Sequence, residues 1–463
     1  MKKALLLALG LIIILCTACT SLDSETEEAI KDDVYSIYET LRSDWAKAKN
    51  VREMEKSITK WAQNNEISCA KLPSDNLLLS EDATDDYKKA PSTLIQCDLS
   101  TDHYSSKAQC AAIAMAALNN SQQHGNVRIL FTASDKSGYY GTEGLSKSQL
   151  KADNLISLTY CKKNRLFTGS AASKEYLLSQ KIKHVKTSGT ISYKAYIGGL
   201  EGGDSSDMTR KHGNPIKALG QFMNSCQSSG LAFQVNDFKG GSSSGTYPSF
   251  AQMTITVDKN DEKKLLETFD TIRKNFEDSY RDNENSLKIS CTKCKTPNTS
   301  YSEEDTANIM SFLYTVKDGT FATENDDEDG EAVAVANIGF ASEKGKNGFV
   351  LGMKGRSINP GIFKKMLRAY KDTADLSDFT IKEKGSFPCW PFRDKSELND
   401  SFKVAARQAD LDLEEQWTFE ENECALFYEK RQDLDMICIG ANIQSGQEIA
   451  QSLVMYLSSL ADE

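Results

Sequence analysis

A glycine-rich tract between residues 193 and 220 constrains the fold of this chain more than any other segment. A run of strand-forming residues ends there in a cluster of glycines, namely Gly198, Gly199, Gly202 and Gly203. Because glycine has no Cβ, the backbone can pass close to another segment at these positions. A helix is then predicted to begin at Asn214-Pro215, since Asn favours the N-cap and Pro the first helical position. The tract therefore predicts a strand, a close backbone approach and a helix, in that order.

Residues before this tract alternate between helical and strand patterns. Helical spacing of apolar residues begins at Ser24, and short apolar runs bounded by polar links occur between the helices. The predicted helices cover residues 24–45, 51–64 and 107–118, and the predicted strands cover residues 76–79, 93–99, 127–132 and 155–160. Strand, helix and strand joined by short connections favour a mostly parallel sheet covered by helices.

The order of elements changes at about Thr187. Strands are predicted at residues 191–197, 231–235, 250–257 and 286–290, and helices at residues 214–229 and 259–280. This order is that of a split βαβ sandwich, an α+β arrangement. Later elements extend it: a helix at 302–316, a hairpin of 333–341 with 348–353, a helix from residue 359 and a strand at 379–382.

The first residues of the chain have the pattern of an export signal. A basic start at Lys2 and Lys3 is followed by an apolar run from Ala4 to Leu15, which is too short for a stable membrane span. The tract Cys16-Thr17-Ala18-Cys19 resembles a bacterial lipoprotein cleavage box, in which Cys19 becomes the lipid-bearing first residue. We expect residues 1–18 to be a lipoprotein signal peptide and the chain to be lipid-anchored on the exported side of a bacterial envelope membrane. A plain secretory signal with an accidental cysteine is the alternative.

Charge and cysteine content narrow the classes of partner and site. The formal net charge is −11, and it becomes −13 once Lys2 and Lys3 leave with the signal peptide. An acidic protein is a poor candidate for binding nucleic acid. Export permits disulfides, but several cysteines lie in apolar periodic segments and are equally well interpreted as buried thiols. Cys291 and Cys294 form a lone CxxC, for which a disulfide or two idle thiols is favoured over a redox pair or a metal site.

The glycine tract resembles the lid-domain signature of the zinc metallopeptidases that include aminoacyl-histidine dipeptidase. That signature reads Gly-Gly-His-Ser-Gly-Gly and precedes a helix start, and here the matching residues 202–207 place Asp204 where the family has histidine. The resemblance covers residues 34–460 and is specific at the tracts WAQNN, DFKGG and LDMICIG. It implies an α/β fold in which residues 19–186 and 385–463 form a peptidase-like domain with a mostly parallel sheet flanked by helices. Residues 187–384 would form an inserted split-βαβ lid, which in this family usually carries a homodimer contact.

The same resemblance identifies the positions at which the family binds two zinc ions. Histidine and carboxylate side chains at strand ends hold these ions, and a glutamate acts as general base on the shared water. In this chain the metal-ligand positions hold Asp98, Ser105, Lys136 and Thr159, and the general-base position holds Asp135. Asp102 lies close enough to Ser105 to replace it. The family's C-terminal histidine loop is replaced by residues 441–446, which contain no histidine.

Positions that hold substrate in the family have changed as well. Asp204 replaces the lid histidine, and Gly245 lies in a tract, residues 244–248, that has lost the family's arginine and asparagine. The chain's histidines do not follow a metal-ligand spacing, and we expect turn or surface positions for all of them: His103, His124, His184 and His212.

These replacements predict that no zinc is bound and that the protein is a catalytically inactive, membrane-anchored, dipeptidase-like lipoprotein. Its function would be to bind a peptide, a murein fragment or a protein partner. The alternative is an active metal-dependent dipeptidase with a remodelled site, in which Asp135 is the base and Asp98, Asp102 and Asp204 carry the cation. A site of Asp98, Asp102 and Asp135 would suit magnesium or calcium, because both ions prefer oxygen ligands. A third hypothesis is an assembly protein that acts through its surface.

Overall fold

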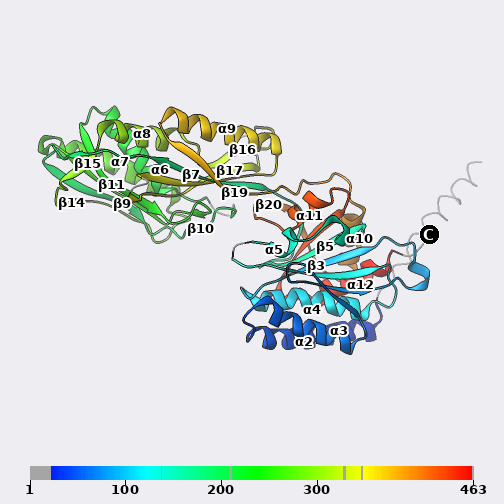
Figure 1. The fold of residues 1–463 in the computed structure, drawn as a ribbon. Coiled ribbons are helices and arrows are strands. Elements are labelled where there is room, and N and C mark those ends of the chain that lie inside the picture. The colour runs from blue at the N-terminus through cyan, green and yellow to red at the C-terminus, as the bar shows by residue number, and fades with distance from the viewer. Residues whose placement is uncertain (1–21, 137, 208–210, 327–329, 346–347, 461–463) are drawn as a thin grey trace, which may run out of the picture. The chain divides into compact units, whose positions relative to one another are not determined.

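The computed structural model describes residues 22–136, 138–207, 211–326, 330–345 and 348–460. The chain divides into two compact units, each with its own hydrophobic core (Figure 1). The first unit lies within residues 1–169, 392–417 and 423–463, and the second within residues 170–391 and 418–422. The second unit is therefore inserted into the first along the chain.

The first unit is built on a mixed sheet with a parallel centre. In spatial order its strands are β1 (Ser68–Leu72), β2 (Asn76–Glu81), β4 (Val127–Ala133), β3 (Thr93–Leu99), β5 (Asn154–Tyr160), β21 (Asp435–Ala441), β6 (Arg165–Ser170) and β20 (Glu414–Thr418). The four strands β4, β3, β5 and β21 are parallel, whereas β1, β2 and β6 pair antiparallel with their neighbours. The carboxyl ends of the central strands consequently lie at one edge of the sheet.

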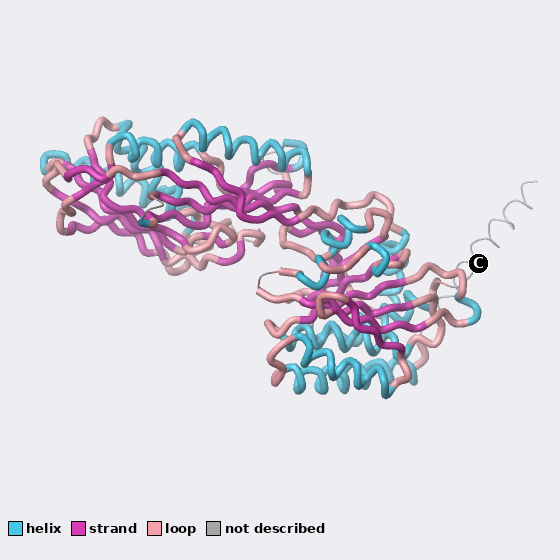
Figure 2. Tube along the Cα trace, viewed as in Figure 1, coloured by secondary structure: helices cyan, strands magenta, loops and turns pink. Residues whose placement is uncertain are grey.

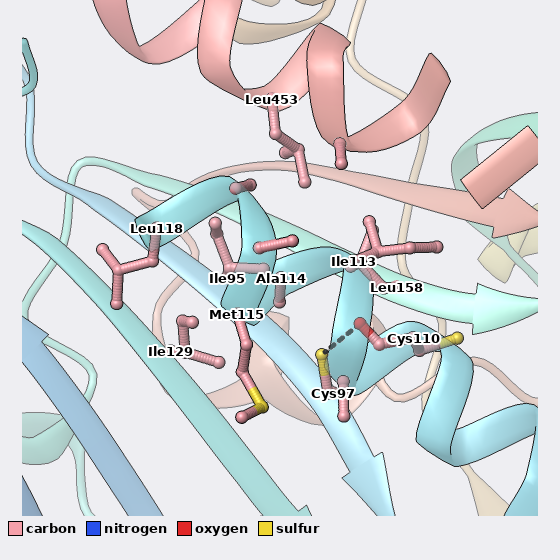
Figure 3. Packing of buried hydrophobic residues seen from close by; sticks show 14 of the residues in the cluster. Ile95, Cys97, Cys110, Ile113, Ala114, Met115, Leu118, Ile129, Leu158 and Leu453 are labelled. Carbon is pink, nitrogen blue, oxygen red and sulfur yellow. Dashed lines mark hydrogen bonds between the residues drawn. The ribbon is translucent and has the colours of Figure 1, made fainter. Parts of the chain in front are cut away.

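Helix α4 (Tyr104–Asn120) forms the centre of the first unit's core. Every residue from Ala108 to Leu118 is buried, so the helix is covered on all sides. It packs against β3, β5, α2 (Ser24–Trp45) and α12 (Gly446–Ser458). Figure 3 shows Ile113, Ala114 and Met115 among side chains of β3, β4, β5 and α12.

The remaining helices of the first unit lie around this core. They are α3 (Val51–Asn64), α5 (Tyr140–Glu143), α10 (Glu397–Gln408) and α11 (Cys424–Lys430). α3 packs against α2, and α10 packs against α12 and β21. In the part of the chain that the structure describes, no helix combines the length and the apolar character needed to cross a membrane.

The second unit is an antiparallel sheet with helices on one face (Figure 2). The described strands run in the order β14 (Lys288–Cys294), β9 (Ile191–Gly198), β13 (Phe250–Val257), β11 (Phe233–Gly241), β17 (Ala332–Glu343), β18 (Phe349–Ser357), β7 (Ala172–Gln180) and β19 (Thr380–Phe387), and β16 (Gly319–Thr323) also pairs with β17. The helices are α6 (Pro215–Ser228), α7 (Glu262–Tyr280), α8 (Glu303–Thr315) and α9 (Pro360–Leu376). Two short ladders complete the unit: β10 (Gly203–Asp204) with β12 (Thr246–Tyr247), and β8 (His184–Lys186) with β15 (Thr299–Tyr301).

The sequence order β9, α6, β11, β13, α7, β14 is the split βαβ arrangement. α6 starts with the predicted cap, because the Asn214 side chain accepts hydrogen bonds from the backbone N–H groups of Ile216 and Lys217 and Pro215 occupies the first turn. Gly199 has φ +79°, and a Cβ at this position would lie 2.0 Å from the Ser286 carbonyl oxygen. The predicted close backbone approach is therefore present.

The second unit begins earlier in the sequence than predicted and ends later than predicted. β7 pairs with both β18 and β19 in the second unit's sheet, although the boundary at residues 186 and 187 assigned it to the first domain. β19 continues to Phe387, past the predicted boundary at residues 384 and 385, and Trp390 forms a β-bridge with Ser170. Backbone pairing thus places both segments in the second unit.

Candidate functional site

Asp98 and Lys107 form an ion pair at the carboxyl end of β3. Asp98 is the sixth residue of the strand, and its side chain is only 12% exposed. Its Oδ1 accepts a hydrogen bond from Ser134 Oγ at 2.5 Å, and its Oδ2 accepts one from Lys107 Nζ. Lys107 lies in the first turn of α4, the helix that directly follows β3. Side chains of this chain therefore engage both oxygens of the Asp98 carboxylate.

The Lys107 ammonium is held in its charged form. Burial favours the neutral amine, but the Asp98 carboxylate outweighs burial, so the pKa of Lys107 is raised above its usual value. The lysine side chain is 24% exposed, which makes this a largely buried pair. Removing one partner of such a pair leaves the other charge buried without compensation, which is strongly destabilising.

A buried polar network lies beside this pair. Glu423, the residue before α11, is 6% exposed. Gln96 Nε2 donates to Glu423 Oε2 at 2.7 Å and to Thr132 Oγ1 at 2.8 Å, and Thr142 Oγ1 donates to Glu423 Oε1. Ser157 Oγ donates to Gln96 Oε1 at 2.6 Å. The network links β3, β4 and β5 to the segment before α11.

Burial determines the protonation of Glu423. The loss of solvation, and secondarily the negative charge of Asp98, raise the pKa of Glu423 to about 7. This carboxyl is therefore mostly protonated below about pH 7 and mostly ionised above it. Asp98 is the carboxylate that Lys107 neutralises.

Other residues at the predicted metal positions have partners or exposures that do not suit a metal ion. Ser105 Oγ lies 2.9 Å from the Tyr38 hydroxyl oxygen. Asp102 Oδ1 lies 3.8 Å from Lys136 Nζ, in a pair whose side chains are 43% and 87% exposed. Thr159 is half-buried in β5.

The predicted general-base position is also solvent-exposed. Asp135 lies just after β4 in a turn, where its backbone exchanges two hydrogen bonds of 3.1 Å with Gly138. Its neighbour Lys136 is also exposed, carries the opposite charge and pairs with Asp102. The general-base position therefore holds an exposed carboxylate beside a cation.

The donor set does not fit zinc. A zinc site takes three or four nitrogen, sulfur or oxygen ligands, and the residues that the structure describes contain no group of three or more His, Cys, Asp or Glu arranged to hold a metal. Asp98 is already neutralised by an ammonium group, so a dication beside it would add uncompensated charge. The described residues at this edge of the sheet therefore do not support zinc-dependent catalysis.

Asp204 in the second unit neutralises a buried arginine. Arg356 on β18 has a side chain that is 3% exposed, and its Nη2 donates to Asp204 Oδ1 at 3.1 Å. Its Nη1 donates to Ser205 Oγ. Burial lowers the pKa of Arg356, and the charges of Asp204 and Glu421 oppose that effect. Asp204, whose own side chain is 63% exposed, thus serves as a counter-ion to the buried guanidinium group.

The tract around Gly245 is held through its backbone. The Gly245 carbonyl oxygen accepts from Ser205 N at 2.9 Å, and Asn337 Nδ2 donates to the carbonyl oxygens of Ser244 and Thr246 at 2.8 and 2.9 Å. The second predicted substrate position therefore contributes main chain to the lid's structure.

Two of the histidines, His124 and His212, lie in loops but have buried side chains, so for them only the surface part of the prediction is wrong. His124 is buried, with Nδ1 2.7 Å from the Gly125 carbonyl oxygen and Nε2 3.3 Å from Glu81. The His212 side chain is 4% exposed and stacks on Tyr247 with ring centroids 4.0 Å apart. By contrast, His103 is exposed, and His184 is 38% exposed. The stacking of His212 on Tyr247 joins residues distant in sequence and could not be predicted from the local sequence pattern.

The cysteines of the CxxC motif are not bridged. Cys291 and Cys294 are free thiols on β14, and so are the buried Cys97, Cys110 and Cys226. Cys97 Sγ lies 3.5 Å from the Cys110 carbonyl oxygen (Figure 3). Burial raises the pKa of Cys110, Cys226 and Cys291 to about 12. These thiols act as packing groups.

Two comparisons connect parts of the sequence to known proteins. Residues 194–284 match the peptidase dimerisation domain family. The cytosol non-specific dipeptidase of Escherichia coli (strain K12) is 28% identical over 170 residues, which are 36% of this chain and 35% of that protein. The match thus spans about a third of the length of this curated relative.

Solved structures share the fold over nearly the whole chain. Aminoacylhistidine dipeptidase from Vibrio alginolyticus superposes with a TM-score of 0.80 at 18% identity, covering 97% of this chain and 99% of that one. A tripeptidase from Staphylococcus aureus gives a TM-score of 0.54 at 10% identity, covering 94% and 99%. The predicted α/β fold with an inserted lid is confirmed, and it is the fold of the aminoacylhistidine dipeptidase structure.

Replacing Glu423 by glutamine should make the free energy of unfolding less dependent on pH. The pKa of Glu423 is about 7 in the folded protein and near 4.5 when unfolded, so the folded state retains the proton longer. The stability from this group is complete below about pH 4.5, falls as the pH rises to about 7 and is constant above. The predicted loss is on the order of 3 kcal/mol.

The measurement is urea unfolding of the wild type and Glu423→Gln between pH 4.5 and 8. Asp318, whose pKa burial raises to about 6, contributes a slope of the same sign, which cancels in the difference between the two proteins. Glu28→Gln, at an exposed position of α2, is the control and should leave the wild-type pH dependence unchanged. Parallel curves for the wild type and Glu423→Gln would contradict the assignment.

Proposed function

We propose that this protein is a catalytically silent relative of the aminoacyl-histidine dipeptidases that functions by binding a peptide or protein partner. One observation carries the proposal: the Lys107 ammonium is bound to Asp98 at the strand end where a zinc-binding side chain is expected. A metallopeptidase needs a metal-bound water as nucleophile. A site neutralised by its own lysine lacks the charge to hold that metal.

The other positions support the same conclusion. Asp135, at the predicted general-base position, is exposed and precedes a lysine. Ser105, at the predicted position of the bridging carboxylate, is hydrogen-bonded to Tyr38. The fold itself is retained in both units, including the inserted lid. A fold that is kept without its metal ligands supports a binding function rather than catalysis. The ligand we propose is a peptide, a murein fragment or a protein.

Metal content and peptidase activity test this proposal together. We expect the purified protein to contain far less than one zinc per chain by plasma mass spectrometry, and to leave β-alanyl-histidine and mixed dipeptides uncleaved after zinc is added. The Escherichia coli dipeptidase, assayed in parallel, is the positive control. Stoichiometric zinc together with turnover that Asp135→Ala abolishes would establish the alternative, an active metal-dependent dipeptidase with a remodelled site.

We also propose that the chain is a lipoprotein anchored through Cys19 on the exported side of the bacterial envelope. Cys19 lies outside the residues that the structure describes, and support comes from the cleavage-box pattern of residues 16–19. In bacteria grown with a fatty-acid analogue, Cys19→Ser should abolish labelling and membrane retention, because the lipid is attached to that sulfur. Cys16→Ser is the matched control and should retain both. Equal labelling of the wild type and Cys19→Ser would refute the anchor.

A lid-mediated homodimer is the proposed assembly. The match of residues 194–284 to the peptidase dimerisation domain supports it. Sedimentation velocity over a concentration series should give a species of twice the mass of one chain. A single monomeric species across the series would exclude the dimer while leaving the proposal of a silent binding protein intact.

A further inference from the structure

We propose that Lys107 is a tethered replacement for a dissociable cation at the end of β3, and that this site binds a small alkylammonium ion once the lysine is shortened. The inference deepens the proposed function, because it specifies what occupies the position that a metal would need.

The geometry is that of a built cation site with one anionic ligand. Asp98 is 9% exposed as a residue, and Ser134 Oγ fixes its Oδ1 at 2.5 Å. The remaining oxygen, Oδ2, accepts from Lys107 Nζ. The carboxylate is therefore oriented by a neutral donor on one side and satisfied by a single cation on the other.

The charges around the pair balance for a monovalent cation. Asp98 carries one negative charge, and below about pH 7 the neighbouring Glu423 is mostly protonated because burial raises its pKa to about 7. Asp102 and Lys136 form a separate, exposed pair. One ammonium group therefore makes the buried cluster neutral, whereas a divalent ion would leave an excess positive charge in a place of low solvation.

Helix α4 delivers the ammonium group. Lys107 immediately precedes the segment Ala108–Leu118, in which every residue is buried, so its backbone is fixed relative to β3. A cation tethered in this way competes at a high effective concentration and cannot diffuse away. A dissolved ion is therefore excluded as long as the lysine side chain is intact.

A plain surface ion pair is the competing interpretation, and it predicts a different outcome. Exposed pairs contribute little, and loss of one partner is almost neutral. The Asp98–Lys107 pair has side chains 12% and 24% exposed, whereas Asp102–Lys136 has side chains 43% and 87% exposed. The second pair thus serves as an internal comparison.

Chemical rescue tests the proposal. Lys107→Ala removes the atoms beyond Cβ, which correspond to n-propylammonium. We expect its melting temperature at pH 6, where Glu423 is mostly protonated, to fall by on the order of 10 °C, because a buried carboxylate loses its partner. Added n-propylammonium chloride should restore at least half of that loss by mass action. Propan-1-ol, which lacks the charge, and tetramethylammonium chloride, which lacks an N–H donor, should not, and Lys136→Ala should show neither the loss nor the rescue.

A double-mutant cycle keeps the proposal falsifiable if Lys107→Ala fails to fold. Lys107→Met preserves much of the side-chain length without charge, and Asp98→Asn removes the anion. We expect the double variant to lose much less than the sum of the two single losses. Additive losses, or rescue by propan-1-ol equal to that by n-propylammonium, would overturn the tethered cation. Stoichiometric zinc in the wild-type protein would overturn the proposed function and this inference together. Additive losses in a zinc-free protein would overturn only the inference, so the two failures are distinguishable.

Discussion

The complete burial of the central segment of α4, Ala108–Leu118, is the constraint on which the first unit depends. A helix that is apolar on every side has to be covered on every side, and here the central strands, α2 and α12 cover it. This packing fixes the start of α4 beside the end of β3. Because Lys107 and Asp98 lie at those two points, the core determines the charge arrangement at the edge of the sheet. The polar site is thus a consequence of apolar packing.

Each unit contains an ion pair at a predicted site position: Asp98 at a predicted metal-ligand position and Asp204 at the predicted lid-histidine position. In the first unit a lysine neutralises a buried aspartate, and in the second an aspartate neutralises a buried arginine. Each pair is completed by a serine hydroxyl, from Ser134 and Ser205 respectively. Both oxygens of Asp98 are therefore engaged by side chains, whereas Arg356 Nε is buried without a hydrogen-bond partner in the part of the chain that the structure describes.

Elements with strong local patterns were predictable from the sequence. The bounds of α3 and β3 agree with those predicted, and α4 extends the prediction by a few residues at each end. β7 was missed because most of its central residues are only half-buried, so it lacks an apolar pattern and is specified by its pairing with β18 and β19. The boundary between units was misplaced for the same reason. Pairing with distant strands leaves little trace in a local window.

The candidate site was predictable only in part. Matching the family tract by tract predicts which side chains stand at the metal positions, including Asp98 and Lys136, and this assignment stays a prediction. It did not identify Lys107 as the partner of Asp98, although the two are separated by only nine residues across a strand-to-helix turn. The link between Gln96 and Glu423 spans 327 residues and could come only from the three-dimensional fold. Hydrogen bonds and ion pairs that depend on tertiary packing cannot be predicted from a single sequence.

The buried thiols impose an order of events on folding. Cys97, Cys110 and Cys226 are shielded in the finished structure, where a raised pKa keeps the reactive thiolate scarce. An unfolded chain has no such shield, and in an oxidising compartment its sulfurs would exchange freely with one another. In such a compartment the yield of native protein depends on whether the core forms faster than non-native disulfides do.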